Sequence, residues 1–176
     1  MSTRHISFDR DAVKIACAFD HAGVPLRDAV LSGLCDGGHE ALDLGDADDY
    51  PQSARAVAAA IIDGEAERGV LVCGSGAGVA VAASKVRGIR AATVSDGYTA
   101  HQSVEHDDLN VLCLGARVIG PELARELVHT FAAARFSGAE RHLRRLAEVA
   151  EIENDNVAHT GATAKEIEAR WPLPLP

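Results

Sequence analysis

The chain has 176 residues, 47% of them hydrophobic, which is enough for one domain with its own core and gives no reason to expect two. Its net charge of −9 argues against general nucleic-acid binding, but local basic clusters could still bind small anions such as a phosphorylated metabolite. No apolar run approaches the ~20 residues of a membrane span, and the polar N-terminal sequence lacks the apolar core of a signal peptide, so we expect a cytoplasmic protein without membrane contact.

Apolar runs alternate with helical patterns along most of the chain. The predicted strands are 13–19, 39–44, 69–73, 90–94 and 111–114. The predicted helices run from Pro25 to about Leu34, from Asp49 to about Asp63, over the small residues after Gly78, from the N-cap Asp96 to about His106, from Pro121 to about Phe136, and from Ala139 to about Glu153. Five strands alternating with helices predict a Rossmann-like three-layer α/β/α sandwich with a five-stranded parallel sheet.

The ends of the chain do not follow this alternation. Residues 1–12 are polar and aperiodic, so we expect an N-terminal extension, then the main domain at 13–154 and a C-terminal extension at 155–176. The C-terminal extension has a candidate capping box at Thr163 to Glu166, and its proline-rich end after Trp171 cannot continue a helix. We expect this end to dock on its own subunit or on a neighbour.

A glycine-rich stretch between Gly69 and Lys85 reads as strand, loop and helix. Gly74, Gly76 and Gly78 leave the backbone free to turn sharply and to approach a ligand, and the following helix offers unpaired N–H groups to negative charge. Cys73 and Ser75 lie at the mouth of the turn. A thiol near a helix N-terminus has its thiolate form favoured, so Cys73 is a candidate nucleophile or base.

Several known loops do not fit this stretch. A dinucleotide fingerprint would need glycine at Val79, and a nucleophile elbow around Ser75 would need glycine at Cys73 and Ala77. A tight βα turn that only buries a cysteine remains an alternative. The four cysteines are scattered without C-x-x-C spacing, which favours reduced thiols over disulfides or zinc, and no metal or other cofactor is expected.

Polar residues follow the predicted strands, where parallel sheets bind ligands. The candidates at these carboxyl ends are Asp20, His21, Cys73, Ser75, Asp96 and Arg117. Arg141, Arg144 and Arg145 lie near the start of the last predicted helix, where they oppose the helix dipole. They form either a solvated face or a binding site for an anion.

Short motifs in a fixed order now point to a family. They are Asp20-His-Ala-Gly23, Asp49-Tyr-Pro51, Cys73-Gly-Ser-Gly-Ala-Gly78, Gly88-Ile-Arg90, His106-Asp-Asp108 with Asn110-Val111, Gly115-Ala-Arg117, and Arg141-His142 with Arg145. From about Val13 to Glu153 the chain resembles the ribose-5-phosphate isomerase B family, which includes the galactose-6-phosphate isomerase subunits. The resemblance implies a metal-independent aldose–ketose isomerase that works through a cis-enediolate, in a homodimer whose active sites use residues of both chains. Whether dimers pair into tetramers stays open.

The resemblance also implies roles for individual residues. By analogy, Cys73 is the base that moves a proton between C1 and C2, and Ser75 with the amides of the 74–78 turn (Gly74, Gly76 and Gly78 among them) holds the developing negative oxygen. His106, assisted by Asp20, would open the furanose ring, although a helix-end histidine that only stabilises the dipole is the alternative. Tyr50 would contact the sugar. The residues that match the phosphate-binding set are His21, Arg117, Arg141 and Arg145, the last two from the neighbouring subunit.

Two positions depart from the family pattern. Asp107 and Ser84 stand where the family usually has asparagine. An amide can donate to a sugar oxygen whereas an ionised carboxylate can only accept, so Asp107 bears on the substrate and not on the fold. The expected reaction interconverts D-ribose 5-phosphate and D-ribulose 5-phosphate. The alternatives are isomerisation of another C4 to C6 sugar phosphate and a non-catalytic sugar-phosphate binding protein.

Overall fold

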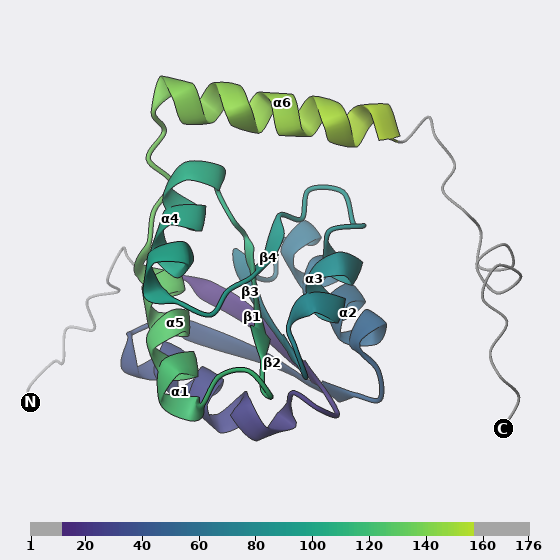
Figure 1. Cartoon of the computed structure of the whole chain (residues 1–176), viewed down its shortest axis with the longest axis vertical. Helices are drawn as coiled ribbons and strands as arrows, with labels where there is room; N and C mark the ends of the chain where they lie inside the picture. Colours follow the sequence, from purple (N-terminus) through teal and green to yellow (C-terminus); the bar gives the residue numbers. More distant parts are fainter. Residues whose placement is uncertain (1–11, 157–176) are drawn as a thin grey trace, which may run out of the picture. The chain divides into compact units, whose positions relative to one another are not determined.

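Five parallel strands form one sheet in the order β2-β1-β3-β5-β4, as the computed structural model in Figure 1 shows. The structure describes residues 12–156. The strands are β1 (Lys14–Asp20), β2 (Glu40–Ala47), β3 (Arg68–Cys73), β4 (Ala91–Thr93) and β5 (Val111–Gly115). The helices are the 3₁₀ turn η1 (Val24–Leu26), α1 (Arg27–Asp36), α2 (Tyr50–Ile62), α3 (Ala77–Ala83), α4 (Gly97–Asp107), α5 (Pro121–Ala133) and α6 (Glu140–Asn156). The predicted Rossmann-like fold is confirmed.

Alternation along the central strands divides the core into two layers. In β1, Ile15, Cys17 and Phe19 face a cluster that includes residues of α1, α4 and α5. Ala16 and Ala18 face the opposite side, where residues of α2 and α3 pack. Because side chains of a strand alternate between faces, a sheet buried on both sides needs an almost continuous apolar sequence, and β1, β3 and β5 have one.

Three helix boundaries differ from the predictions, one of them the end of α6, which lies at Asn156 and not near Glu153. The turn that Pro25 opens is 3₁₀, and the α-helix begins only at Arg27. The helix that starts at Pro121 ends at Ala133 and not near Phe136. Its last carbonyls accept hydrogen bonds from the guanidinium of Arg68 on β3, at 2.6 Å for Phe131 and 3.0 Å for Ala134, so a residue distant in the sequence caps this helix.

The chain falls into two compact units, and the second begins at Gly138. Its described part is α6, which carries Arg141, Arg144 and Arg145 on exposed positions. The Arg144 guanidinium pairs with Glu148 one turn later at 2.7 Å. The expected extensions are 1–12 and 155–176, and α6 continues to Asn156, inside the second of them. The rest of both, residues 1–11 and 157–176 with the capping box and Trp171, lies outside the described residues.

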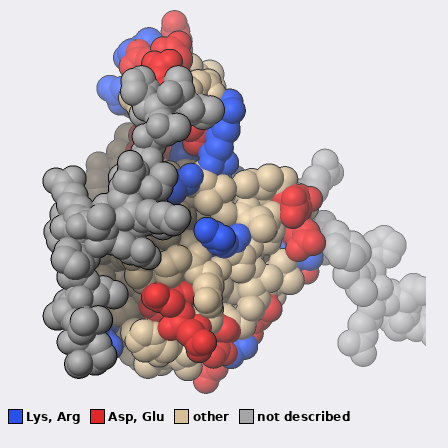
Figure 2. Space-filling view, turned by 90° about the vertical axis from the view of Figure 1, so that its right-hand side faces the viewer, with Lys and Arg blue, Asp and Glu red and all other residues tan. Residues whose placement is uncertain are grey.

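Acidic residues outnumber basic ones in the chain, which has a net charge of −9. Figure 2 shows acidic side chains gathered on the lower part of one face, and an isolated basic group in the middle of a largely uncharged area. An anionic ligand therefore has to be recognised by a few local groups. None of the described helices is both long enough and apolar enough to cross a membrane.

Candidate active site

An open pocket of about 370 Å³ lies at the carboxyl ends of β1 and β3. Beyond β1 the sheet continues to β2, and beyond β3 it continues to β5 and β4, so the order of the strands reverses between these two neighbours. Loops that leave such a switch point diverge to opposite faces and open a crevice. The pocket is lined by Asp20, His21, Ala22, Asp49, Tyr50, Cys73, Gly74, Ser75, Gly78, Arg117 and Val118.

Cys73 is the last residue of β3, and only 4% of it is exposed. Its sulfur accepts a hydrogen bond from the Gly76 amide at 3.1 Å. Gly76 has φ +81°, a left-handed conformation that glycine adopts without strain and that turns its N–H back toward the sulfur. The main-chain amide therefore fixes the sulfur against the first turn of the glycine loop.

Some main-chain amides in the loop after Cys73 donate hydrogen bonds within the protein, and others are available to a ligand. The Ala77 amide donates to the Ser75 hydroxyl oxygen at 3.3 Å, and the Gly76 amide donates to the Cys73 sulfur. Within the described chain, the amides of Gly74, Ser75 and Gly78 have no hydrogen-bond partner. Fewer amides of the 74–78 turn are therefore available to an oxyanion than the sequence implied, because the Gly76 amide donates to the Cys73 sulfur and the Ala77 amide to the Ser75 hydroxyl.

Asp20 and His21 form the wall that follows β1. One carboxylate oxygen of Asp20 accepts the amides of Ala22 and Gly23, each at 2.9 Å, and the residue is only 4% exposed. The Nδ1 of His21 lies 2.9 Å from the main-chain carbonyl of Asp48. A carbonyl only accepts, so Nδ1 carries a proton and Nε2 is the nitrogen left for a ligand.

Tyr50, on α2, and Arg117, in the loop after β5, form another part of the pocket wall. Asp49 caps α2 and accepts the Tyr50 amide at 2.8 Å. A Cβ at Gly78 would lie 3.3 Å from the tyrosine ring, so the glycine lets the ring lie against the loop. The Arg117 amide donates to the Gly74 carbonyl at 2.9 Å, and among the described residues its guanidinium has no ion-pair partner.

Five expected site residues do not line this pocket: Gly76, His106, Asp107, Arg141 and Arg145. His106 and Asp107 end α4, and the Gln102 side-chain amide donates to His106 Nδ1 at 2.7 Å, which selects the tautomer protonated on Nε2. Asp107 is exposed. Arg141 and Arg145 lie one turn apart on α6, and Arg141 Nε donates to the ring of His142 at 3.0 Å.

Part of the motif pattern is structural. Arg90 donates to the main-chain carbonyl of Asp108 at 2.7 Å and pairs with its carboxylate. The Asn110 side chain accepts the Arg90 amide and donates to the Gly88 carbonyl, each at 2.8 Å. These residues hold the turn that follows α4, and Ser84 at the end of α3 bonds the Ala91 carbonyl. None of them lines the pocket.

Sequence reasoning assigned no role to some groups of the pocket. Ala22, Asp49 and Val118 line it, and the Asp48 carbonyl orients His21. Asp49 could have been found from its motif beside Tyr50, whereas a main-chain carbonyl has no signature in the sequence. Among the described residues, no three His, Cys, Asp or Glu side chains converge to hold a metal ion.

Known proteins are similar to most of this chain in sequence and in fold. A family model described as Ribose/Galactose Isomerase matches residues 15–149. Ribose-5-phosphate isomerase B of Escherichia coli (strain K12) is 40% identical over 80% of this chain and 96% of its own length. D-erythrulose-4-phosphate isomerase 2 of Mycolicibacterium smegmatis is 42% identical over 71% of this chain and 87% of its own. The structure of ribose-5-phosphate isomerase B from Mycoplasma genitalium with bound ribulose-5-phosphate is similar with a TM-score of 0.74 and 36% identity, over 81% of this chain and 97% of that one.

Proposed function

Since the chain belongs to the Ribose/Galactose Isomerase family of sugar-phosphate isomerases, we propose that it interconverts D-ribose 5-phosphate and D-ribulose 5-phosphate. The observation that carries this proposal is the nearly buried Cys73 sulfur in a pocket whose wall also carries Arg117 and His21. The reaction needs a base that moves a proton between two carbons, close to cationic groups that can bind the phosphate of the substrate.

The chemistry moves one proton between carbons and one between oxygens. In the open-chain aldose, the Cys73 thiolate takes the proton from C2 and returns it to C1. In the same conversion the C2 hydroxyl loses its proton and the carbonyl oxygen on C1 gains one. Negative charge develops on these oxygens in the cis-enediolate, and the Ser75 hydroxyl with the amides of Gly74 and Gly78 supplies donors for it.

The phosphate is bound by charge-assisted hydrogen bonds. Arg117 offers a guanidinium that has no ion-pair partner among residues 12–156, and His21 offers Nε2 as an imidazolium. The Tyr50 ring lies against Gly78 in the pocket wall, and in this proposal it contacts the sugar carbons and hydroxyls. In a chain with a net charge of −9, these groups make the pocket locally favourable for an anion.

A second copy of the chain completes the site in this proposal. Every residue that lines the pocket belongs to the first unit, and His106, Asp107, Arg141 and Arg145 are not among them. A homodimer would bring a partner's histidine, protonated on Nε2, to the ring oxygen, with Asp20 of the first chain as its counterpart for ring opening. The partner's arginines would add the remaining phosphate contacts.

A second candidate substrate follows from Asp107. Its carboxylate is exposed and can only accept hydrogen bonds. The relative of 42% identity is named for a four-carbon sugar phosphate. Isomerisation of a C4 or a C6 sugar phosphate is therefore the alternative reaction, and a non-catalytic binding protein is the alternative class.

One experiment separates these functions. The protein is incubated in D₂O with a panel of C4 to C6 aldose phosphates, while product formation and deuterium incorporation at C1 and C2 are followed by NMR. We expect the highest kcat/KM for D-ribose 5-phosphate, with solvent deuterium in substrate or product. A higher kcat/KM for another sugar phosphate would replace the substrate assignment, and binding without any exchange or product would refute the isomerase.

A further inference from the structure

The strand β2 contains a bulge immediately before it reaches the pocket. Its register with β1 runs from Lys14↔Glu40 to Cys17↔Asp43 and resumes at Phe19↔Asp46. Only Ala18 separates the partners on β1, whereas two residues, Leu44 and Gly45, separate them on β2. One extra residue in one strand is a β-bulge, which bends the strand and redirects the residues beyond it.

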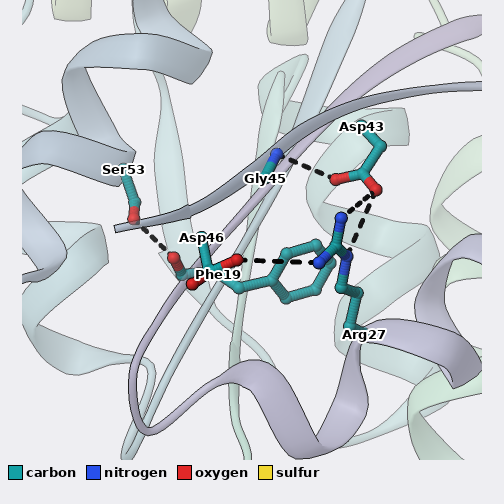
Figure 3. Close-up of polar contacts among 6 residues, drawn as sticks. All are labelled: Phe19, Arg27, Asp43, Gly45, Asp46 and Ser53. Carbon is teal, nitrogen blue, oxygen red and sulfur yellow. Dashed lines mark hydrogen bonds and ion pairs between the residues drawn. The ribbon is translucent and has the colours of Figure 1, made fainter. Parts of the chain in front are cut away.

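Three polar contacts hold the bulge. Gly45 has φ +84°, and its amide donates to one carboxylate oxygen of Asp43 at 2.9 Å. The other oxygen of Asp43 accepts Nε and Nη2 of Arg27 at 3.2 and 2.6 Å. Arg27 Nη1 also lies 3.6 Å from the Asp46 carboxylate beyond the bulge, so one guanidinium contacts a residue on each side of it (Figure 3).

Arg27 is itself fixed. It is the first residue of α1, and its guanidinium lies over the ring of the buried Phe19, 5.9 Å from the centroid. On the other side, the Ser53 hydroxyl donates to the Phe19 carbonyl at 2.9 Å and ties α2 to the same strand (Figure 3). The bulge is therefore held between the beginning of α1 and the end of β1.

The segment that follows the bulge leads into the pocket. β2 ends at Ala47, and the next carbonyl, that of Asp48, accepts the hydrogen bond from His21 Nδ1. Asp49 and Tyr50 come next and line the pocket. Loss of the bulge would shift this segment by one residue against β1, and such a shift turns each side chain to the other face.

We propose that Arg27 and Asp43 are positioning residues: their ion pair holds the β2 bulge and thereby places the Asp48 carbonyl on His21 and the Tyr50 ring in the pocket. The inference rests on the proposed function, because it assigns His21 and Tyr50 to the sugar phosphate. Neither Arg27 nor Asp43 lines the pocket, so their effect is transmitted by the backbone of β2.

The test compares Arg27→Gln with Arg125→Gln in the full chain. Arg125 is a matched control, because it also binds α1, through Ser32 at 2.7 Å and Asp36 at 3.2 Å, and its side chain is 38% exposed against 34% for Arg27. At a temperature where both variants are folded, Arg27→Gln should raise KM for the sugar phosphate about fivefold, the worth of one ordinary hydrogen bond. Arg125→Gln should leave KM within about twofold of wild type, by the same scale.

A second readout does not depend on activity. The ¹⁵N shifts of the His21 ring should report the Nδ1–H tautomer in the wild type and in Arg125→Gln, and a mixture of tautomers in Arg27→Gln. Arg27→Lys keeps the charge but not the paired donors and should be intermediate, so the comparison survives if Arg27→Gln fails to fold.

A change in KM or tautomer confined to the Arg27 variants supports the proposal. Absence of both changes, or the same changes in Arg125→Gln, overturns it. If the wild type isomerises no sugar phosphate, the proposed function fails, while the tautomer comparison still decides whether the ion pair positions His21.

Discussion

Replacement of Cys73 by alanine tests the central chemical assignment. A positioned general base contributes ~10² to 10⁴ in rate, so kcat should fall by at least about a hundredfold. The contacts expected to anchor the substrate, Arg117 and His21, do not involve the sulfur, so the dissociation constant should change by less than about threefold, a smaller effect than the loss of one typical hydrogen bond. Loss of the sulfur leaves the Gly76 amide without its acceptor, at a cost to stability of about 1 kcal/mol.

The chain offers a matched control in Cys113. This residue lies on the neighbouring strand β5 and faces the same core layer as Cys73, but it is fully buried and outside the pocket. Burial raises the pKa of the Cys113 thiol, so it remains uncharged and cannot serve as a base. Cys113→Ala should therefore lower the melting temperature without a comparable loss of kcat.

The assay follows ketose formation and solvent deuterium exchange for both cysteine variants, and a titration measures sugar-phosphate affinity. If Cys73→Ala kept more than about a tenth of the wild-type kcat, another base would have to be sought, since that loss is smaller than a positioned base contributes. Equal losses in Cys113→Ala would show that the effect comes from the core and not from the thiolate.

Three other predictions address the shared site, the substrate and the core. If Arg141 acts in a partner's pocket, mixing inactive Cys73→Ala with inactive Arg141→Ala should restore activity in heterodimers, and failure despite demonstrated subunit exchange would contradict a shared site. Asp107→Asn should shift the kcat/KM ratio toward D-ribose 5-phosphate by about tenfold, the effect of one modest hydrogen bond, and an equal change for every sugar phosphate would rule out a specificity contact. Burial, aided by the nearby charge of Arg135, lowers the pKa of His39 below its usual 6.5, so the unfolded chain binds this proton first. The unfolding free energy should be maintained above about pH 6.5 and fall as the pH drops through the lower pKa of His39 in the folded protein. His39→Gln should weaken this pH dependence, measured by denaturant titrations at several pH values. An unchanged pH dependence in the variant would contradict the prediction.

Local signals predicted the elements well where local contacts decide them. Asp96 was expected to cap a helix, and its carboxylate accepts the Thr99 amide at 2.8 Å at the start of α4. The end of α5 could be read only in part, because its last carbonyls accept hydrogen bonds both from the nearby Arg135 and from Arg68, which reaches them from β3. A pattern along one helix contains no information about a cap that comes from another element.

Some motif residues had a different meaning from what their pattern suggested. Arg90, Asp108 and Asn110 stood among the family motifs beside His106, yet they bond one another and hold a turn. Identity at a position does not distinguish a residue that contacts substrate from one that shapes the loop. The hydrogen-bond partners make that distinction.

The sequence by itself determined the parallel sheet and the polar residues at its carboxyl edge. The period of the apolar residues sets which faces are buried, and strands that run parallel bring their carboxyl ends to one edge. Asp20, Cys73 and Arg117 were predicted to meet there, and all three line one pocket. Only the tertiary structure decided the finer arrangement: which amides of the glycine loop are already used, how His21 is oriented, and where the bulge in β2 lies. These features depend on main-chain groups, and because every residue carries the same amide and carbonyl, their pairing is fixed by packing and not by residue type.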